Sequence, residues 1–265
     1  MSGPAFLMCP PDYYEIAYEI NPWMSLRRSV DKAKAASQWN HFYELLTKQI
    51  KVKVELLNSV PGLPDLVFTA NGGLVRKRIF VRSNFRHKER KAEAGYFEKW
   101  FKKKGYLIKT IAQPFCFEGE GDALFMGQEL YTGFHFRSDV EAHDALSGYL
   151  RASYFALELA DKRFYHLDTC FAPLDEKTAL VYLPAFEAYA QLVLLENIPD
   201  PVRVPEKEAL CFACNVVVAG RNVVIPSGCP ETTRELENRG FHVYALDFSE
   251  FIKAGGAGKC LVLKI

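Results

Sequence analysis

The sequence predicts an α/β protein in which one unit, a β-hairpin followed by a helix and another strand, recurs along the chain. Short apolar segments occur in pairs around turns, segments with apolar residues at helical spacing follow them, and a further apolar strand comes after each helix. The turns recur at intervals of about 45 to 55 residues, the range of propeller-like repeats. Such units can close into a ring, and the alternative is an ordinary α+β domain with incidental hairpins.

The first unit is predicted between residues 65 and 111. Residues 65–68 form a strand, the chain turns at Gly72-Gly73, and residues 78–81 return. Residues 91–104 then form a helix with one apolar face. Gly105 stops this helix before a strand at residues 106–111.

The second and third units follow the same order. In the second, a hairpin begins at residues 123–125, a helix extends from about residue 140 to 161, and a strand follows at 164–167. In the third, strands at residues 170–172 and 179–182 flank a turn, and a helix follows at 188–195.

The fourth unit is the most regular, and a fifth can be assembled from the two ends of the chain. A hairpin joins residues 215–218 to 222–225, a helix covers 231–239 after Pro230, and a strand lies at 241–246. In the fifth unit, the strand after Cys260 pairs with residues 6–9, beside a helix near residues 26–48.

Composition indicates one globular domain over residues 1–265. Of the 265 residues, 49% are hydrophobic and 25% charged, which are ordinary globular values, and no Pro/Gly/Ser-rich linker divides them. The formal net charge of +1 argues against nucleic acid as a partner. No apolar run approaches the roughly 18 residues of a membrane span, and no export signal precedes the domain. The seven scattered cysteines are therefore expected to be reduced thiols in the cytoplasm.

Cys260 is the first candidate for chemistry. It follows the run Gly255-Gly256-Ala257-Gly258-Lys259 and precedes a short apolar strand. Glycines let a ligand approach the backbone closely, and a neighbouring lysine favours the thiolate of a cysteine. This arrangement suggests covalent catalysis, which also needs a base and acidic partners.

Two further segments place polar residues beside glycines. Asn71 stands at the Gly72-Gly73 turn, where a structural turn asparagine is the simpler explanation. Glu118 and Asp122 belong to a Glu-Gly-Glu-Gly-Asp run between apolar residues, where carboxylates are partly desolvated. A divalent-metal loop is the alternative for this run, although its spacing does not match an EF-hand.

The remaining candidates are a His-x-Asp pair and two arginines. On a strand, His166 and Asp168 would face the same side and could meet one substrate, although a lone strand histidine is often structural. Arg90 and Arg137 each follow a hairpin, and surface solvation is the simpler explanation for either. The Cys211–Cys214 spacing lacks the second pair of a zinc site, so core thiols are expected there.

In this order, the asparagine, the Glu-Gly-x-Gly-Asp run, the His-x-Asp pair and the glycine-rich terminal cysteine resemble the guanidino-group-modifying superfamily. The resemblance covers nearly the whole chain. It implies the pentein fold, a five-bladed α/β propeller of ββαβ-type repeats around a pseudo-fivefold axis. It also implies cofactor-free, metal-free hydrolysis of a small guanidino substrate.

The resemblance implies a role for each matching residue. Cys260 would attack the guanidinium carbon, His166 would protonate the leaving amine and then activate water, and Glu118 and Asp168 would hold the guanidinium nitrogens. The other substrate-binding residues that it implies are Arg137 and, less directly, Arg90 for the α-carboxylate of the substrate, together with Asn71, Asp122 and Asn21.

Two departures resemble the arginine dihydrolases in particular, which convert arginine to ornithine, ammonia and carbon dioxide. Asn71 replaces the aspartate of the arginine deiminases, and the Glu118 run carries one extra residue. The segment at residues 19–24, which contains Asn21, also resembles the dihydrolases. A neutral amide can both donate to and accept from a ureido group, which would keep citrulline bound for a second hydrolysis.

Three alternatives stay open. A methylarginine hydrolase or a deiminase would stop at citrulline, and an amidinotransferase would need an amine acceptor. The ribosome anti-association factors share the fold without chemistry, but a binding module has no use for Cys260, His166 and Glu118 together. A homo-oligomer is possible.

Overall fold

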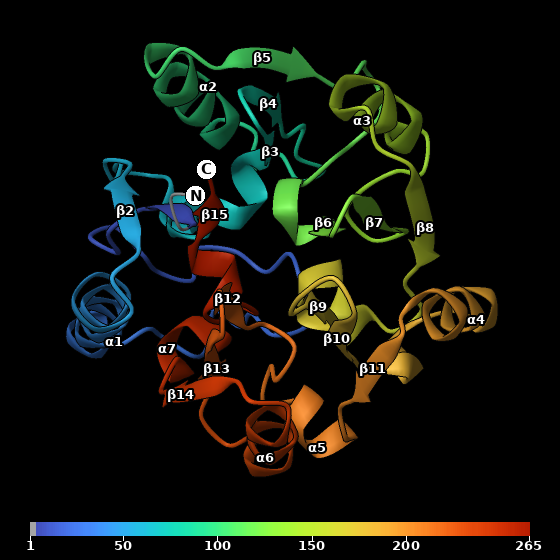
Figure 1. Cartoon of the computed structure of the whole chain (residues 1–265). Helices are drawn as coiled ribbons and strands as arrows, with labels where there is room; N and C mark the ends of the chain where they lie inside the picture. The colour runs from blue at the N-terminus through green and yellow to red at the C-terminus, as the bar shows by residue number, and fades with distance from the viewer. Residues whose placement is uncertain (1–3) are drawn as a thin grey trace.

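The computed structural model describes residues 4–265 as a mixed α/β fold, with its strands in five separate three-stranded sheets. The sheets are arranged in a ring, with helices around the outside (Figure 1). In chain order they contain β3 (Gly73–Arg76), β4 (Ile79–Arg82) and β5 (Leu107–Thr110); β6 (Ala123–Met126), β7 (Glu129–Phe134) and β8 (Tyr154–Glu158); β9 (Phe171–Pro173), β10 (Thr178–Val181) and β11 (Asp200–Arg203); β12 (Val217–Ala219), β13 (Asn222–Pro226) and β14 (His242–Leu246); and β15 (Leu263–Lys264), β1 (Ala5–Met8) and β2 (Lys53–Leu56).

Every sheet has the same internal pattern. Its middle strand pairs antiparallel with the inner strand and parallel with the outer strand. The inner strands β3, β6, β9, β12 and β15 lie nearest the centre of the ring (Figure 1). A parallel pairing needs a crossover, and a helix supplies it between the middle and outer strands of each sheet.

The chain forms seven α-helices within residues 4–265. They are α1 (Lys32–Glu44), α2 (Glu93–Lys103), α3 (Ala142–Leu150), α4 (Ala188–Asn197), α5 (Glu206–Ala209), α6 (Pro230–Asn238) and α7 (Ser249–Ile252). In α2, Phe97 and Phe101 are fully buried, and the ring of Phe101 stacks on Phe80 of β4 at 3.8 Å between centroids. Burying each phenylalanine contributes about 2 to 3 kcal/mol, which fastens the helix to its sheet.

The two ends of the chain meet in one sheet, as predicted. Phe6 and Leu7 of β1 pair with Lys264 and Leu263 of β15. Thr69, in the turn before β3, donates its hydroxyl to the carbonyls of Leu7 (2.9 Å) and Leu261 (3.0 Å). The ring is therefore closed by hydrogen bonds between the two ends of the chain and the neighbouring sheet.

Several predicted elements are confirmed, and others are wrong or misplaced. The helices at α2, α4 and α6, the β9–β10 and β12–β13 hairpins and the strand β14 lie where they were expected. Residues 65–68 are not a strand: Pro64–Val67 is a 3₁₀ turn with consecutive buried side chains, and the β3–β4 hairpin turns at Lys77 and Arg78. In a half-buried strand every second side chain is buried, whereas all four side chains of Pro64–Val67 are buried, so the apolar residues here do not indicate a strand.

The second unit also differs from its prediction. Helix α3 ends at Leu150, where Arg151 adopts a left-handed conformation with φ of 51°, and the outer strand of the sheet is β8. Residues 164–167 are not a strand, because Lys162–Phe164 and Leu167–Thr169 form 3₁₀ turns. Helix α1 begins at Lys32, six residues later than predicted, because Asp31 caps it by accepting from the Lys34 amide at 2.9 Å.

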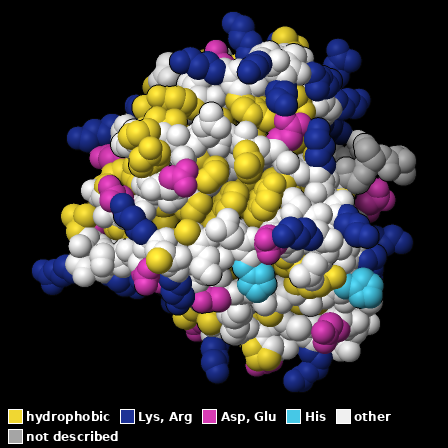
Figure 2. Space-filling view, turned by 90° about the vertical axis from the view of Figure 1, so that its left-hand side faces the viewer, with side chains coloured by type: hydrophobic (Ala, Val, Ile, Leu, Met, Phe, Trp, Pro, Cys, Tyr) yellow, Lys and Arg dark blue, Asp and Glu magenta, His cyan; other side chains and the backbone are white. Residues whose placement is uncertain are grey.

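The surface on the side of α1, β2 and α2 mixes both charge signs with apolar side chains (Figure 2). Exposed apolar side chains of these elements include Leu56 of β2, which is 43% exposed, and Tyr96 of α2, which is 37% exposed. Lysines and arginines are spread over the same surface. No helix within residues 4–265 is both long and apolar enough to cross a bilayer.

A substitution at Gly119 tests how tightly the main chain is packed at the centre of the ring. The φ of Gly119 is +63°, and a Cβ there would lie 2.5 Å from the Ala70 carbonyl oxygen and 2.7 Å from the Gly73 amide nitrogen. We expect Gly119→Ala to lower the free energy of unfolding by at least about 2 kcal/mol, because the left-handed backbone and the contact with main chain both oppose a side chain. Urea unfolding measures this change.

The matched control is Gly148→Ala in α3, where a Cβ meets nothing within 4 Å. That substitution should raise the free energy of unfolding by about 0.5 to 1 kcal/mol, because alanine is the better helix former. Equal effects of the two substitutions would contradict the tight packing around Gly119.

Candidate active site

A buried polar side chain precedes each of the five inner strands by one to three residues. These side chains are Asn71, Asp122, Asp168, Asn215 and Cys260. None is more than 3% exposed. Because the inner strands surround one centre, the repeated fold brings residues that are far apart in sequence to the same end of the ring.

Glu118 lies at the middle of a buried charge cluster. Its Oε2 accepts from Arg137 Nη1 at 2.9 Å and lies 2.9 Å from His166 Nε2, and its Oε1 accepts from the Arg86 amide at 3.1 Å. Burial opposes ionisation of this carboxyl, but Arg137 and His166 outweigh it and hold the pKa of Glu118 well below its usual range. Glu118 is thus a fixed anion that orients the imidazole.

Asp122 stands behind the imidazole. Its Oδ2 accepts from the Ser138 hydroxyl at 2.6 Å and lies 4.0 Å from His166 Nε2, and its Oδ1 accepts from the Leu167 amide at 3.1 Å. Burial raises the pKa of Asp122 to about 6, and the nearby His166 limits the rise. The predicted Glu118, His166 and Asp122 therefore form one cluster.

Cys260 and Asp168 form a second cluster. Cys260 Sγ lies 3.5 Å and 3.9 Å from the two carboxylate oxygens of Asp168. Burial raises the pKa of the Cys260 thiol, and the Asp168 charge raises it further. Burial also raises the pKa of Asp168 to about 7, against the opposing effect of Lys259. Lys259 thus offsets only part of the effect of burial, and among the described residues no ion pair holds Asp168 in its charged form.

Contrary to the prediction, His166 and Asp168 do not share a strand. His166 precedes the 3₁₀ turn Leu167–Thr169, and Asp168 lies within it. The turn sends the imidazole toward Glu118 and the carboxylate toward Cys260. Within residues 4–265, no hydrogen bond joins Cys260 to His166, so the two side chains can act on a ligand from separate positions.

A nearly filled cavity of about 10 Å³ lies beside these clusters. Its lining includes Cys260, Asn71, Asp65, Tyr165 and Arg137. Two buried atoms of that lining, Asn71 Nδ2 and Asp65 Oδ1, have no hydrogen-bond partner among the described residues. An unpaired buried donor and acceptor are costly, which indicates that a polar ligand normally satisfies them.

Arg90 is occupied by the protein itself. It donates from Nε and Nη2 to Glu93 at 2.9 and 2.8 Å, from Nη2 to the Asp65 carbonyl at 3.1 Å, and from Nη1 to Asn71 Oδ1 at 2.9 Å. The side chain is 3% exposed and lies over the Phe85 ring, so it is not a surface arginine. In this arrangement Arg90 orients the amide of Asn71, with Nδ2 left free.

Asn21 belongs to a segment that covers the cavity. Its Oδ1 accepts from the amides of Trp23 (2.9 Å) and Met24 (3.2 Å), and its Nδ2 donates to the Ala254 carbonyl at 3.0 Å. Ile20, next to it, accepts from Arg137 Nη2 at 3.0 Å. Asn21 therefore ties the covering segment to the turn that precedes Cys260.

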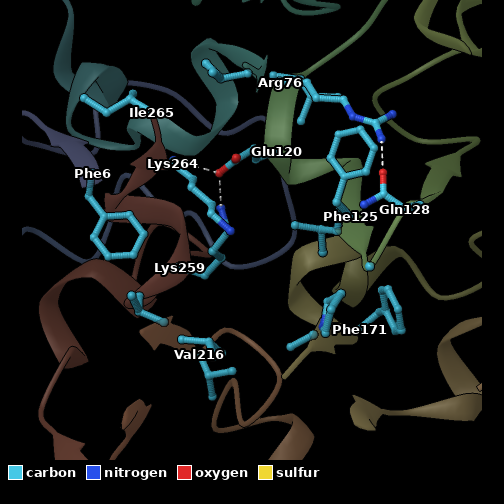
Figure 3. A pocket seen from close by; sticks show the side chains of 18 of the residues that line it. Phe6, Arg76, Glu120, Phe125, Gln128, Phe171, Val216, Lys259, Lys264 and Ile265 are labelled. Atoms are coloured by element: carbon cyan, nitrogen blue, oxygen red, sulfur yellow. Dashed lines mark hydrogen bonds and ion pairs between the residues drawn. The ribbon is translucent and has the colours of Figure 1, made fainter. Parts of the chain in front are cut away.

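Lys259 points away from this site. Its Nζ lies 2.9 Å from Glu120 Oε2, in a second cavity of about 490 Å³ whose lining includes residues of all five inner strands (Figure 3). Glu120 also accepts from the Lys264 amide at 3.1 Å. The lysine beside Cys260 is therefore ion-paired outside the Cys260 cavity, which reduces its effect on the thiol.

Sequence reasoning missed Asp65, Tyr165 and Asn215. Asp65 and Tyr165 had been assigned to strands, but the hydroxyl of Tyr165 donates to the Gly255 carbonyl at 2.8 Å in the turn before Cys260. Asn215 occupies the same place in the fourth unit as Asn71 does in the first, and this repeat was the available signal. Cys211 and Cys214 are free thiols, and residues 4–265 contain no metal-binding group of three or more His, Cys, Asp or Glu side chains.

Asp168→Asn tests whether burial destabilises the charged form of this carboxyl, which has no ion-pair partner within residues 4–265. The pKa of Asp168 is raised from 3.8 to about 7 in the folded protein. Between these values the folded state keeps a proton that the unfolded chain has released, so stability falls as pH rises. The substitution should change little at about pH 4 and should stabilise by about 2 to 4 kcal/mol at about pH 7.5.

Urea unfolding at both pH values measures the difference. The exposed Asp144→Asn in α3 is the control and should have little effect at either pH. An Asp168→Asn variant that is no more stable than wild type at the higher pH would contradict the assigned environment.

Comparisons with known proteins place the chain among its relatives. No family model matches it. It is 42% identical over 266 positions to the bifunctional arginine dihydrolase/ornithine cyclodeaminase ArgZ of Synechocystis, and the match covers 98% of this chain but 37% of that protein. It is 38% identical over 260 positions to the N(G),N(G)-dimethylarginine dimethylaminohydrolase of Mycobacterium tuberculosis, covering 98% and 85% of the two chains.

The structural comparison agrees. The crystal structure of the N-terminal domain of ArgZ bound to substrate superposes with a TM-score of 0.95 at 39% identity, over 98% of this chain and 97% of that domain. The chain thus spans 37% of the length of full ArgZ. It belongs to the guanidino-group-modifying enzyme superfamily, the penteins, which contains the arginine dihydrolases and the dimethylarginine dimethylaminohydrolases.

Proposed function

We propose that this protein is a cofactor-free thiol hydrolase of guanidino substrates, of the arginine dihydrolase type. The observation that carries the proposal is the pairing of Cys260 with Asp168, a buried thiol 3.5 Å from a buried carboxylate that has no ion-pair partner among the described residues. A guanidinium between Asp168 and Glu118 would supply that partner. The ArgZ domain, at 39 to 40% identity, has been observed with substrate and with product bound.

The substrate-binding roles follow from the charges. A planar guanidinium offers several N–H donors, and the carboxylates of Asp168 and Glu118 accept them in charge-assisted hydrogen bonds worth about 1.5 to 3 kcal/mol each. Arg137 lines the cavity and would pair with the α-carboxylate of the substrate. Arg90 would act through Asn71, and Asn21 would help to hold the covering segment over the substrate.

In the first step, the Cys260 thiolate attacks the guanidinium carbon and forms a C–S bond. The substrate cation beside Asp168 favours the thiolate, which burial otherwise opposes. His166, held by Glu118, donates a proton to the departing nitrogen, and ammonia leaves as the C–N bond breaks. Asp168 and Glu118 hold the remaining nitrogens of the tetrahedral centre, so they stabilise the transition state.

In the second step, His166 removes a proton from water, which attacks the same carbon. The C–S bond breaks, Cys260 regains its thiolate, and citrulline is formed. Asp122 supports the imidazole as it changes charge, since their closest atoms are 4.0 Å apart. Every step uses side chains of this chain and water alone.

Asn71 would determine whether citrulline remains bound in the site after the first hydrolysis. Arg90 holds its Oδ1 at 2.9 Å, and its Nδ2 has no partner among the described residues. The free N–H can donate to the ureido oxygen of citrulline, an acceptor that the guanidinium lacks. Bound citrulline would then undergo a second attack by Cys260, yielding ornithine, a second ammonia and carbon dioxide.

Further proposals concern the fold, the domain organisation and the cellular compartment. We propose that the five sheets are the blades of a pentein propeller with a pseudo-fivefold axis and that residues 1–265 form one domain. A thiol nucleophile must stay reduced, which suits the cytoplasm. A possible homo-oligomer stays a prediction.

The second candidate is a methylarginine hydrolase that releases citrulline and an alkylamine. It is supported by the 38% identity to the Mycobacterium tuberculosis dimethylarginine dimethylaminohydrolase, of which the chain covers 85%. Parallel assays with arginine and dimethylarginine separate the two candidates. Faster turnover of dimethylarginine would favour the second.

Product analysis tests the dihydrolase proposal. With arginine, we expect mass spectrometry to find ornithine and about two ammonia for each arginine consumed, because Asn71 retains citrulline. Asn71→Asp should shift the product toward citrulline by about tenfold or more, since it removes the amide donor. Stoichiometric citrulline from the wild-type protein would exclude two rounds of hydrolysis.

Cys260→Ser tests the covalent mechanism. Ammonia release should fall by about a thousandfold or more, because a serine hydroxyl in this buried site is a far weaker nucleophile than a thiolate. Cys116→Ser, at a half-buried cysteine outside the cavity, is the control and should retain activity. Activity that survives in Cys260→Ser would refute the proposed chemistry.

A further inference from the structure

Asn215 holds the nucleophile turn through both its main chain and its side chain. Its Oδ1 accepts from the amides of Ala257 (3.0 Å) and Cys260 (3.2 Å), and its main-chain carbonyl accepts from the Lys259 amide at 3.1 Å. Its Nδ2 donates to the Asp168 carbonyl at 3.0 Å and to Cys260 Sγ at 3.2 Å. The residue has no exposed surface.

The orientation of this amide is fixed by its surroundings. If the side-chain oxygen and nitrogen were exchanged, the NH₂ group would face two N–H donors and the oxygen would face the Asp168 carbonyl. Both contacts would be repulsive. One N–H of Asn215 therefore must point at the Cys260 sulfur, where a donated hydrogen bond strengthens when the sulfur becomes an anion.

We propose that Asn215 positions Cys260 and supplies the hydrogen bond that stabilises its thiolate during attack. The proposal rests on the function proposed above, with Cys260 as the nucleophile. With Asn215, the fourth unit of the ring also contributes a residue to the site, as the other units do with Asn71, Asp122, Asp168 and Cys260. Those four residues precede the other inner strands at equivalent places.

The main-chain N–H of Ala257 also lowers the pKa of the thiol, but no other side chain near the sulfur donates a hydrogen bond to it among the described residues. Asp168 faces it as a hydrogen-bond acceptor, and its charge opposes the thiolate. Lys259, on the same turn, is directed to Glu120. Tyr165 donates its hydroxyl to the Gly255 carbonyl. Among the described residues, the side-chain hydrogen-bond donor within reach of Cys260 Sγ is Asn215 Nδ2.

Asn215→Asp separates the two parts of the proposed role. An aspartate keeps an oxygen for the amides of Ala257 and Cys260 but loses the N–H that faces the sulfur. We expect kcat for arginine to fall about 10- to 100-fold with a smaller change in KM, because a hydrogen bond to a charged group is lost. The pH midpoint of Cys260 alkylation by iodoacetamide, followed by peptide mass spectrometry, should rise by about one unit or more.

Asn215→Ala removes both parts and should add a loss of thermal stability. Asn222→Asp on β13 is the matched control, because it alters a half-buried asparagine bonded to the Ala219 carbonyl. It should leave the alkylation midpoint unchanged. Asparagine restored at position 215 should recover both kcat and the midpoint.

The outcomes are distinguishable from failure of the proposed function. If Asn215→Asp folds with an unchanged alkylation midpoint and unchanged kcat, the role of Asn215 is refuted while Cys260 chemistry stands. If Asn215→Asp does not fold, the residue is structural and the proposal is also refuted. If Cys260→Ser retains activity, the function itself is wrong, whatever the midpoint shows.

Discussion

The structure depends on one electrostatic constraint: more carboxyl groups than cations are buried around the central cavity. Five acids (Asp65, Glu93, Glu118, Asp122 and Asp168) surround it with two arginines, Arg90 and Arg137. Glu93 and Glu118 have arginine partners within 2.9 Å. Asp168 has none, and burial raises its pKa to about 7. Folding therefore tolerates an unfavourable charge, which the proposed guanidinium substrate would relieve on binding.

The ring allows this arrangement because each unit delivers one polar side chain to the centre. The inner strand that follows that side chain belongs to a sheet that packs on apolar side chains, such as Phe97 and Phe101 of the first unit. This apolar cluster is shared with the neighbouring sheet, because it also contains Leu7 and Leu263. Stability and chemistry are thus assigned to different parts of each unit. Lys259 illustrates the division, since its charge is neutralised by Glu120 in the opposite cavity rather than beside Cys260 (Figure 3).

The sequence predicted the repeated order of elements because amphipathic helices and glycine turns leave local signals. It failed where several consecutive residues are buried without a strand, as at Pro64–Val67, because periodicity is absent there. Motif resemblance singled out Cys260, His166 and Glu118 as candidate catalytic residues, and the structure places Glu118 beside His166. It did not reveal that Arg90 is occupied by Glu93 and Asn71, because a contact between side chains distant in the fold leaves no local pattern. Asn215 was missed because a lone asparagine before an apolar strand carries no signal outside the repeat.

The central claim is that this buried acidic site activates Cys260 for covalent attack on a guanidinium. The most direct measurement is acid quenching of arginine turnover at high protein concentration, followed by intact-mass and peptide mass spectrometry, in wild type and in His166→Ala. The account predicts an adduct with the mass of arginine less one ammonia, located on Cys260. Ammonia release with no adduct on Cys260, or with an adduct on another residue, would contradict it.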